Sequence, residues 1–303
     1  MENAVKERSR ARYAMILFIM VLVVVLMAAV AAAVLLDSPE KTANPNEGVQ
    51  VHNAPGQEEV WEEEVLEEED TSPASVLHLL PENPYGQFDF QYDGWFLKST
   101  VVDCLSGIDV SAYQGEIDWA KVKESGVDFA IVRLGYRGYE SGKITEDKFA
   151  KANLEGASAA GVQLGVYFFS QALNVEEARE EAQYVLDVIK DYDVTMPVVF
   201  DWEHVNNETA RTNGMDPYVA TDCAKAFLEV IEEAGYWPMM YFNSFQARKL
   251  FYLDKLMKYD FWLALYSDRM TFPYKVDMWQ YTCTGTIPGV YGNVDVNVLF
   301  LHE

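Results

Sequence analysis

Two carboxylic acids lie one residue apart at the end of an apolar run, in the segment VVFDWEHV (198–205). If the run is a buried strand, its alternation points Asp201 and Glu203 to one face and Trp202 to the other. Such a pair suits acid–base chemistry, because crowding can keep one carboxyl protonated while its neighbour stays ionised. A single acid in this place is more often a solvated strand end or a helix cap, so the pair needs support from other residues.

Two further acids occupy comparable places, since Asp109 ends one apolar run and Asp295 lies within another. In a closed barrel the last strand lies beside the first, which would bring both acids near the pair. Four converging carboxyls suit the hydrolysis of a glycosidic bond. Acids at a barrel mouth also bind divalent metals in phosphodiesterases, although for a phosphate this chain offers little beyond Arg133 and His204.

Strand-like and helix-like segments alternate through the last two-thirds of the chain. We expect strands at 107–111, 128–136, 162–169, 197–203, 238–243, 261–266, 276–282 and 294–301, and helices at 118–126, 146–161, 175–192 and 217–235. Strands that are apolar on both faces, joined by amphipathic helices, predict a parallel sheet covered on both sides. So many strands favour an α/β barrel, which would carry its chemistry at the carboxyl ends of the strands.

Aromatic residues in or near these strands could stack on the apolar faces of sugar rings, although in a chain this rich in aromatics most belong to the core. The candidates are Tyr167, Tyr241, Tyr266, Trp279 and Tyr281. Trp279 and Tyr281 alternate with Gln280, so only one of these two sets can face the barrel interior.

The region before the barrel divides into three parts. Residues 1–13 are basic, and 14–36 form an uncharged apolar run long enough to span a bilayer as a helix. The positive-inside rule then places the N-terminus in the cytoplasm and the rest outside the cell, unless a signal peptidase cuts near residue 33 and releases a secreted protein. Residues 37–80 are proline-rich and acidic, which predicts a flexible linker before a folded region at 81–303.

Composition excludes several classes of function. The formal charge of −25, from 48 acids and 23 bases, argues against nucleic acid. Three dispersed cysteines and four histidines give neither a disulfide framework nor metal-ligand spacing, so we expect no metal and no cofactor. Sequence does not identify a protein partner.

Five segments resemble the successive motifs of glycoside hydrolase family 25 lysozymes. They occur in the family's order and are distributed across nearly the whole of residues 105–303. They are GIDVSAYQGEIDWAKVKESGVDFAIVRLGY (107–136), GVQLGVYFFSQ (161–171), MPVVFDWE (196–203), MWQYT (278–282) and GNVDVNVLF (292–300). The acidic, anchored layout is similar to membrane-bound members from Gram-positive bacteria.

The resemblance implies a (β/α)5(β)3 barrel and a muramidase that cuts the β-1,4 bond between N-acetylmuramic acid and N-acetylglucosamine in peptidoglycan. By position, Glu203 matches the general acid and Asp201 the second catalytic carboxylate, which acts as nucleophile or orients the substrate's acetamido group. Asp109 and Asp295 match the supporting acids.

Five residues are expected to bind substrate. Tyr167, Tyr241 and Trp279 fall where the family lines its sugar subsites, and we add Gln280 and Arg133. The alternative is an anchored module that binds glycan as a scaffold and cuts it weakly or not at all.

Overall fold

The structure, a computed structural model, describes residues 71–301. The predicted basic N-terminus, the predicted transmembrane helix at 14–36 and residues 37–70 of the predicted linker lie outside this range. Within residues 71–301, no helix combines the length and apolarity that crossing a membrane requires.

Eight strands close into a barrel in the order β3-β11-β10-β9-β8-β7-β6-β4, because β4 also pairs with β3. A ninth strand, β5, pairs with the carboxyl end of β4. Their bounds are β3 Cys104–Val110, β4 Phe129–Arg137, β5 Ile144–Glu146, β6 Gln163–Ser170, β7 Val194–Trp202, β8 Pro238–Asn243, β9 Asp260–Ala264, β10 Met278–Gly285 and β11 Val294–Phe300.

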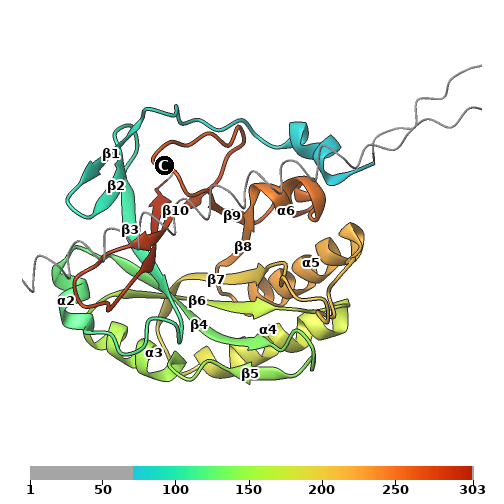
Figure 1. Cartoon of the computed structure of the whole chain (residues 1–303), viewed down its shortest axis with the longest axis horizontal. Helices are drawn as coiled ribbons and strands as arrows, with labels where there is room; N and C mark the ends of the chain where they lie inside the picture. Colours follow the sequence, from blue (N-terminus) through green and yellow to red (C-terminus); the bar gives the residue numbers. More distant parts are fainter. Residues whose placement is uncertain (1–70, 302–303) are drawn as a thin grey trace, which may run out of the picture. The chain divides into compact units, whose positions relative to one another are not determined.

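Helices follow the first five barrel strands and are absent between the last three. They are α2 Trp119–Glu124, α3 Ala150–Ala159, α4 Val175–Ile189, α5 Pro217–Glu233 and the short α6 Ser244–Lys249, with a 3-10 turn η2 at Leu253–Leu256. Figure 1 shows α2 to α5 along the outside of the strands β3 to β7. The predicted α/β barrel is therefore confirmed in its described part, including the helix-poor end.

The local signals that start and stop these helices are the expected ones. Asp118 caps α2 by accepting the amide of Lys121, and Asp216 caps α5 by accepting two amides of its first turn. Gly126 follows α2 with φ of +97°, a left-handed conformation that ends a helix most easily at glycine. Such caps fix where each helix begins, and so how each loop leaves its strand.

Strand direction decides which ends meet at one mouth. Neighbours from β3 through β10 are parallel, whereas β11 is antiparallel to both β10 and β3. The beginning of β11 therefore lies beside the carboxyl end of β3, and Asp295 is the register partner of Asp109. The expected approach of these two acids follows from this reversal.

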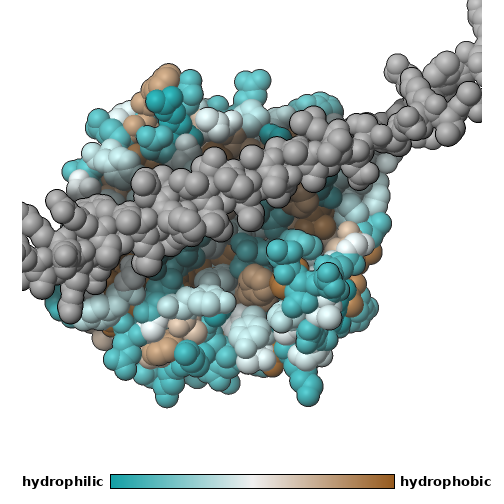
Figure 2. All heavy atoms as spheres, viewed as in Figure 1, coloured by the Kyte–Doolittle hydropathy of each residue, from teal (hydrophilic) through white to brown (hydrophobic). Residues whose placement is uncertain are grey.

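Two apolar clusters hold the barrel together. One fills its interior with side chains such as Phe129, Met239 and Trp262, and the other lies between strands and helices. Gly107 belongs to the interior, where an added Cβ would lie 2.2 Å from the ring of Phe129. Figure 2 shows mostly hydrophilic residues around the visible rim, with hydrophobic ones in separate small patches.

Residues 71–103 cover the side of the barrel that has few helices. They form a 3-10 turn η1 (Pro73–Leu79) and a hairpin of β1 (Phe90–Asp93) and β2 (Phe96–Ser99). Leu77 and Leu80 are buried, and the ring of Phe90 packs edge-on against Trp279 at 5.0 Å. Residues 73–80 of the predicted linker are therefore folded, because their apolar side chains pack on the core.

Candidate active site

A cavity of about 930 Å³ lies where the parallel strands of the barrel end. All four predicted acids line it, as do Tyr167, Tyr241, Gln280 and Arg133. The apolar interior cluster, which includes Tyr241 and Trp262, underlies the acids, so they stand on a packed floor rather than over a pore. This is the mouth predicted from the barrel rule.

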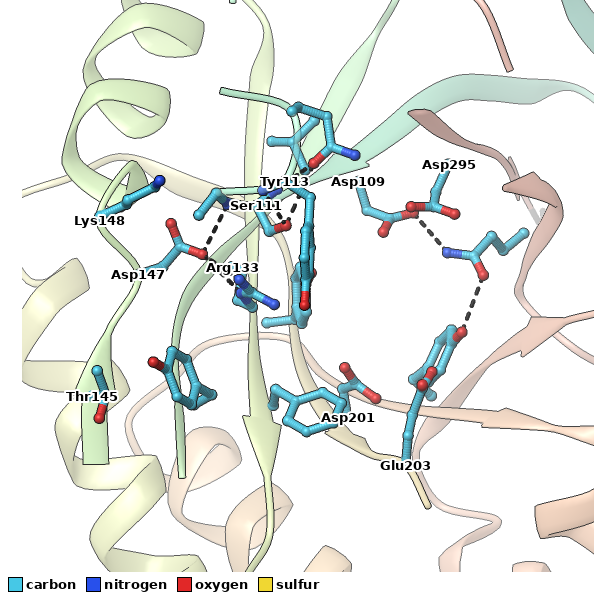
Figure 3. A pocket seen from close by; sticks show the side chains of 18 of the residues that line it. Asp109, Ser111, Tyr113, Arg133, Thr145, Asp147, Lys148, Asp201, Glu203 and Asp295 are labelled. Carbon is cyan, nitrogen blue, oxygen red and sulfur yellow. Dashed lines mark hydrogen bonds and ion pairs between the residues drawn. The ribbon is translucent and has the colours of Figure 1, made fainter. Parts of the chain in front are cut away.

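The acids reach the cavity from three strands. Asp109 and Asp295 are paired neighbours on β3 and β11, while Asp201 is in β7 and Glu203 follows its last residue. Figure 3 shows the first two side by side, with Asp201 and Glu203 across the cavity from them. Trp202 points away and packs edge-on against Phe251, as the alternation predicts. The four acids predicted from the sequence therefore lie around one cavity.

Asp109 is held by two amides. Gln280 and Asn297 each donate a hydrogen bond of 2.8 Å to its Oδ2 atom. The Oε1 atom of Gln280 accepts from the hydroxyls of Tyr241 at 3.0 Å and Tyr266 at 3.2 Å, so one side chain connects three others. The network fixes the position of Asp109 on the wall of the cavity.

Burial raises the pKa of each acid, and like charges add to the effect for three of them. The pKa of Asp109 is raised well above its usual range by burial and by the charge of Asp295. Burial and the Glu203 charge raise the pKa of Asp295 to about 6, and burial raises that of Glu203 against a hydrogen bond from Tyr241. The cluster therefore keeps protons at pH values where isolated carboxyls would be ionised.

Asp201 has the least compensated carboxyl of the group. It is 6% exposed, and its Oδ1 atom finds no hydrogen-bond partner among the described residues. Burial, then Glu203 and then Asp109 raise its pKa, while the charge of Arg133 lowers it. A buried oxygen without a partner is available to a group of the substrate.

Arg133 and Asp147 form the other side of the cavity. The guanidinium of Arg133 bonds to Oδ2 of Asp147 at 2.8 Å and lies over the ring of Tyr113, 5.2 Å from its centroid. In the view of Figure 3, Tyr113 stands between this ion pair and the acids. Arg133 thus reaches the cavity as predicted, already bound to an acid.

The structure decides which residues of the WQY motif face the interior. Gln280 lines the cavity, whereas Trp279 is fully buried on the outer face and donates its Nε1 hydrogen to the carbonyl of Leu265. Trp279 is therefore not brought to the site, because the alternation that turns Gln280 inward turns Trp279 toward the hairpin at 90–99. The predicted substrate contact of Trp279 has no support in this geometry.

Sequence reasoning gave no role to several residues of this site. Asn297, which holds Asp109, lies two residues after Asp295, so the same alternation could have identified it. Tyr113 and Asp147 come from loops, whose positions depend on β5 and on contacts between distant segments. No local pattern in the sequence marks these two.

The site can move protons and stabilise charge. A protonated carboxyl can donate to a leaving oxygen, and an ionised one can stabilise positive charge that develops on the opposite side of a scissile bond. Within residues 71–301, no set of three His, Cys, Asp or Glu side chains is placed to hold a metal ion.

Comparison with known proteins agrees with the fold. The model of the family "Glycosyl hydrolases family 25" matches residues 108–290. Lysozyme M1 from Streptomyces globisporus is 29% identical over 213 residues, which is 64% of this chain and 67% of that protein.

Solved structures show the same fold. The modular autolysin LytC from Streptococcus pneumoniae aligns with a TM-score of 0.56 and 29% identity over 65% of this chain, and has also been determined with a synthetic peptidoglycan ligand. This chain spans only about half of LytC, 47% of its length. A family 25 glycosyl hydrolase from Bacillus anthracis gives a TM-score of 0.56 at 22% identity, covering 73% of this chain and 95% of that one.

A closed barrel with buried acids at its mouth is a form that glycoside hydrolases use. The family match covers more than half of the sequence and includes three of the four acids, Asp109, Asp201 and Glu203. This chain belongs to glycosyl hydrolase family 25 and is a glycoside hydrolase. Membership favours glycosidic-bond hydrolysis over the phosphodiesterase chemistry that the acids alone left open.

Proposed function

We propose that this chain is a lysozyme that cuts the β-1,4 bond between N-acetylmuramic acid and N-acetylglucosamine in peptidoglycan. The observation that carries the proposal is the convergence of Asp109, Asp201, Glu203 and Asp295 on one cavity, with the pKa of each raised by burial. Lysozyme M1 and the autolysin LytC support the choice of substrate.

Glu203 acts as the general acid. Burial raises the pKa of Glu203 and so favours the protonated carboxyl, which gives its proton to the leaving glycosidic oxygen as the bond breaks. The Tyr241 hydroxyl, which donates to Gln280, also lies within hydrogen-bonding reach of this carboxyl. After the leaving sugar departs, the ionised Glu203 removes a proton from the attacking water.

Asp201 faces the anomeric centre. Its unpartnered oxygen either attacks that carbon or accepts a hydrogen bond from the acetamido group, which then attacks in its place. In both cases the ionised form of Asp201, which the charge of Arg133 favours, stabilises the positive charge of the transition state. Asp109 and Asp295 add negative potential beside it, and Tyr167, Gln280 and Arg133 line the walls that contact sugar.

Digestion of purified peptidoglycan by the full-length chain tests the proposal. The products are reduced with borohydride and their ends identified by mass spectrometry, for wild type, Glu203→Gln and the exposed control Glu208→Gln. We expect new muramitol ends from wild type and the control and none from Glu203→Gln. Glucosaminitol ends would mean that another bond is cut.

The same experiment separates the enzyme from a scaffold. If wild type yields no new ends but still sediments with peptidoglycan, the barrel is a glycan-binding module and the catalytic assignment is wrong. A Glu203→Gln protein that sediments like wild type but makes no ends supports the enzyme, because only proton transfer is lost.

The location of the enzyme is proposed from sequence alone. The apolar run at 14–36 and the acidic linker after it support a single-pass anchor with the catalytic domain outside the membrane of a Gram-positive-type cell. Proteolysis of intact protoplasts tests this orientation, since an external barrel would be removed while a cytoplasmic one would be protected.

A further inference from the structure

The backbone that carries Glu203 lies just beyond the last register pairs of β7. The pairing of β7 with β6 ends at Ser170 and Trp202, and its pairing with β8 ends at Asp201 and Tyr241. The carbonyl of Glu203 therefore lies where the parallel sheet has stopped and the loop to α5 begins. Other groups must satisfy it if it is to stay ordered.

Two glutamine side chains supply hydrogen bonds at this point. Nε2 of Gln171 donates to the carbonyl of Glu203 at 2.9 Å, and Nε2 of Gln246 donates to the carbonyl of Trp202. Gln171 directly follows β6, and Gln246 lies in α6 after β8. Side-chain amides that follow the two flanking strands, β6 and β8, thus extend the hydrogen bonding of β7 beyond the end of the sheet.

Both amides are themselves oriented. Their oxygens accept hydrogen bonds of 2.7 Å, from the hydroxyl of Thr212 for Gln171 and from the backbone amide of Asn243 for Gln246. Because each oxygen is engaged, each NH2 group donates to the backbone of Trp202 or Glu203, and that of Gln171 also donates to the carbonyl of Ser170 at 2.8 Å. Gln171, Gln246 and Thr212 are 0%, 2% and 2% exposed, so water does not replace these contacts.

We propose that Gln171 and Gln246, with Thr212 behind the first, clamp the backbone of Trp202 and Glu203 and so position the Glu203 carboxyl for catalysis. They are positioning residues, since they act on the peptide groups and not on the substrate. The inference rests on the proposed role of Glu203 as general acid. A shift of about 1 Å at a reacting group lowers turnover by about 10²-fold, so a small loosening here is measurable.

Thr212 offers a mild way to loosen the clamp. Thr212→Val keeps the shape of the side chain and removes the hydroxyl that orients Gln171, whereas Thr212→Ser keeps the hydroxyl. Thr221→Val is the matched control, because Thr221 is a threonine of α5 with 1% exposure whose hydroxyl, within residues 71–301, hydrogen-bonds to the backbone of Pro217 and Tyr252. Gln171→Ala and Gln246→Ala are the stronger variants.

In the full-length chain we expect Thr212→Val to lower kcat by about tenfold or more with KM changed less than twofold. Thr212→Ser and Thr221→Val should keep the kcat of wild type. If the Glu203 carboxyl moves toward solvent, it loses part of the burial that raises its pKa. The Glu203 pKa, followed by carbon-13 NMR, should therefore fall in Thr212→Val and the glutamine variants, and the alkaline limb of the kcat profile should move to lower pH with it.

An unchanged Glu203 pKa together with an equal loss of activity at every pH would show that Thr212 and the glutamines only support folding, and would overturn the proposal. Unchanged kcat in Thr212→Val with unchanged pKa would do the same. The NMR titration needs no turnover. If Glu203→Gln proves active, the proposed function fails, while the effect of the clamp on the Glu203 carboxyl can still be measured.

Discussion

Two of the places where this barrel buries carboxylic acids differ in how the charge of the acid is paired. Glu181, on α4, is fully buried and lies 2.6 Å from Nε of Arg137, whose own side chain is 4% exposed. The same guanidinium bonds to the carbonyl of Gly142 and the carboxylate of Glu180, so it ties the β4–β5 turn to α4. This acid is paired with a cation, although its Oε2 atom, like Oδ1 of Asp201, has no hydrogen-bond partner among the described residues.

The mouth of the barrel has the opposite arrangement. Asp201 is about as deeply buried, yet its nearest charged companions include the acids Glu203 and Asp109, and the guanidinium of Arg133 is bonded to Asp147. The convergence of like charges lowers the stability of the fold there, since each ionised carboxyl opposes the others. We propose that the contrast separates acids that hold the structure from acids that serve catalysis.

Replacing Asp201 by asparagine tests the catalytic half of this contrast and should have the largest effect. We expect turnover of peptidoglycan to fall by about 10³-fold, because an amide neither attacks carbon nor stabilises positive charge. The melting temperature should stay equal or rise, since one of several crowded acids is removed. Exposed Asp191→Asn is the control and should change neither quantity. A variant that melts clearly lower would show that Asp201 supports the fold after all.

Replacing Arg137 by methionine tests the structural half. It leaves Glu181 buried without its cation, and loss of one partner from a buried pair costs about 3–5 kcal/mol of unfolding free energy. Urea denaturation at pH 8 measures this cost. The exposed pair of Lys151 and Glu155, 3.8 Å apart, gives the comparison, since Lys151→Met should change stability by less than about 1 kcal/mol. Equal losses in both variants would remove the distinction between buried and surface pairs.

Sequence predicted the acids of the mouth better than the support around them. Asp109 and Asp201 stand at strand ends, where hydrophobic runs and strand direction define position locally. Asp295 required the assumption that the barrel closes, and the structure confirms that closure through β11 and β3. A single geometric rule therefore placed residues that lie far apart in the chain.

The rest could not be predicted because it depends on contacts between distant segments. Alternation showed that Gln280 and Trp279 face opposite sides, but only the assembled barrel shows which side is inside. No local pattern indicates that Arg137 and Glu181 pair, because their contact forms only when β4 and α4 pack together. Leu77 and Leu80 follow an acidic, proline-rich stretch, so only their contacts in the assembled fold show that they are buried.

Replacing Glu181 by glutamine should change the pH dependence of stability. Burial raises the pKa of Glu181 from 4.5 to about 7, despite the hydrogen bond from Arg137. The folded state then resists ionisation of this carboxyl more than the unfolded chain does, so wild type loses stability as pH rises from about 4.5 to about 7 and no more above that range.

Glutamine cannot ionise and escapes this loss. The unfolding free energy of Glu181→Gln, minus that of wild type, should therefore increase by roughly 3 kcal/mol across this range and stay constant on either side of it. Urea denaturation at several pH values from 4 to about 9 measures the difference, and the subtraction removes contributions from the acids at the mouth, which both proteins share. A difference that decreases with pH would mean that the ion pair with Arg137 outweighs burial. Ionisation of Glu181 would then stabilise the fold through Arg137, whereas ionisation of the acids at the mouth opposes folding.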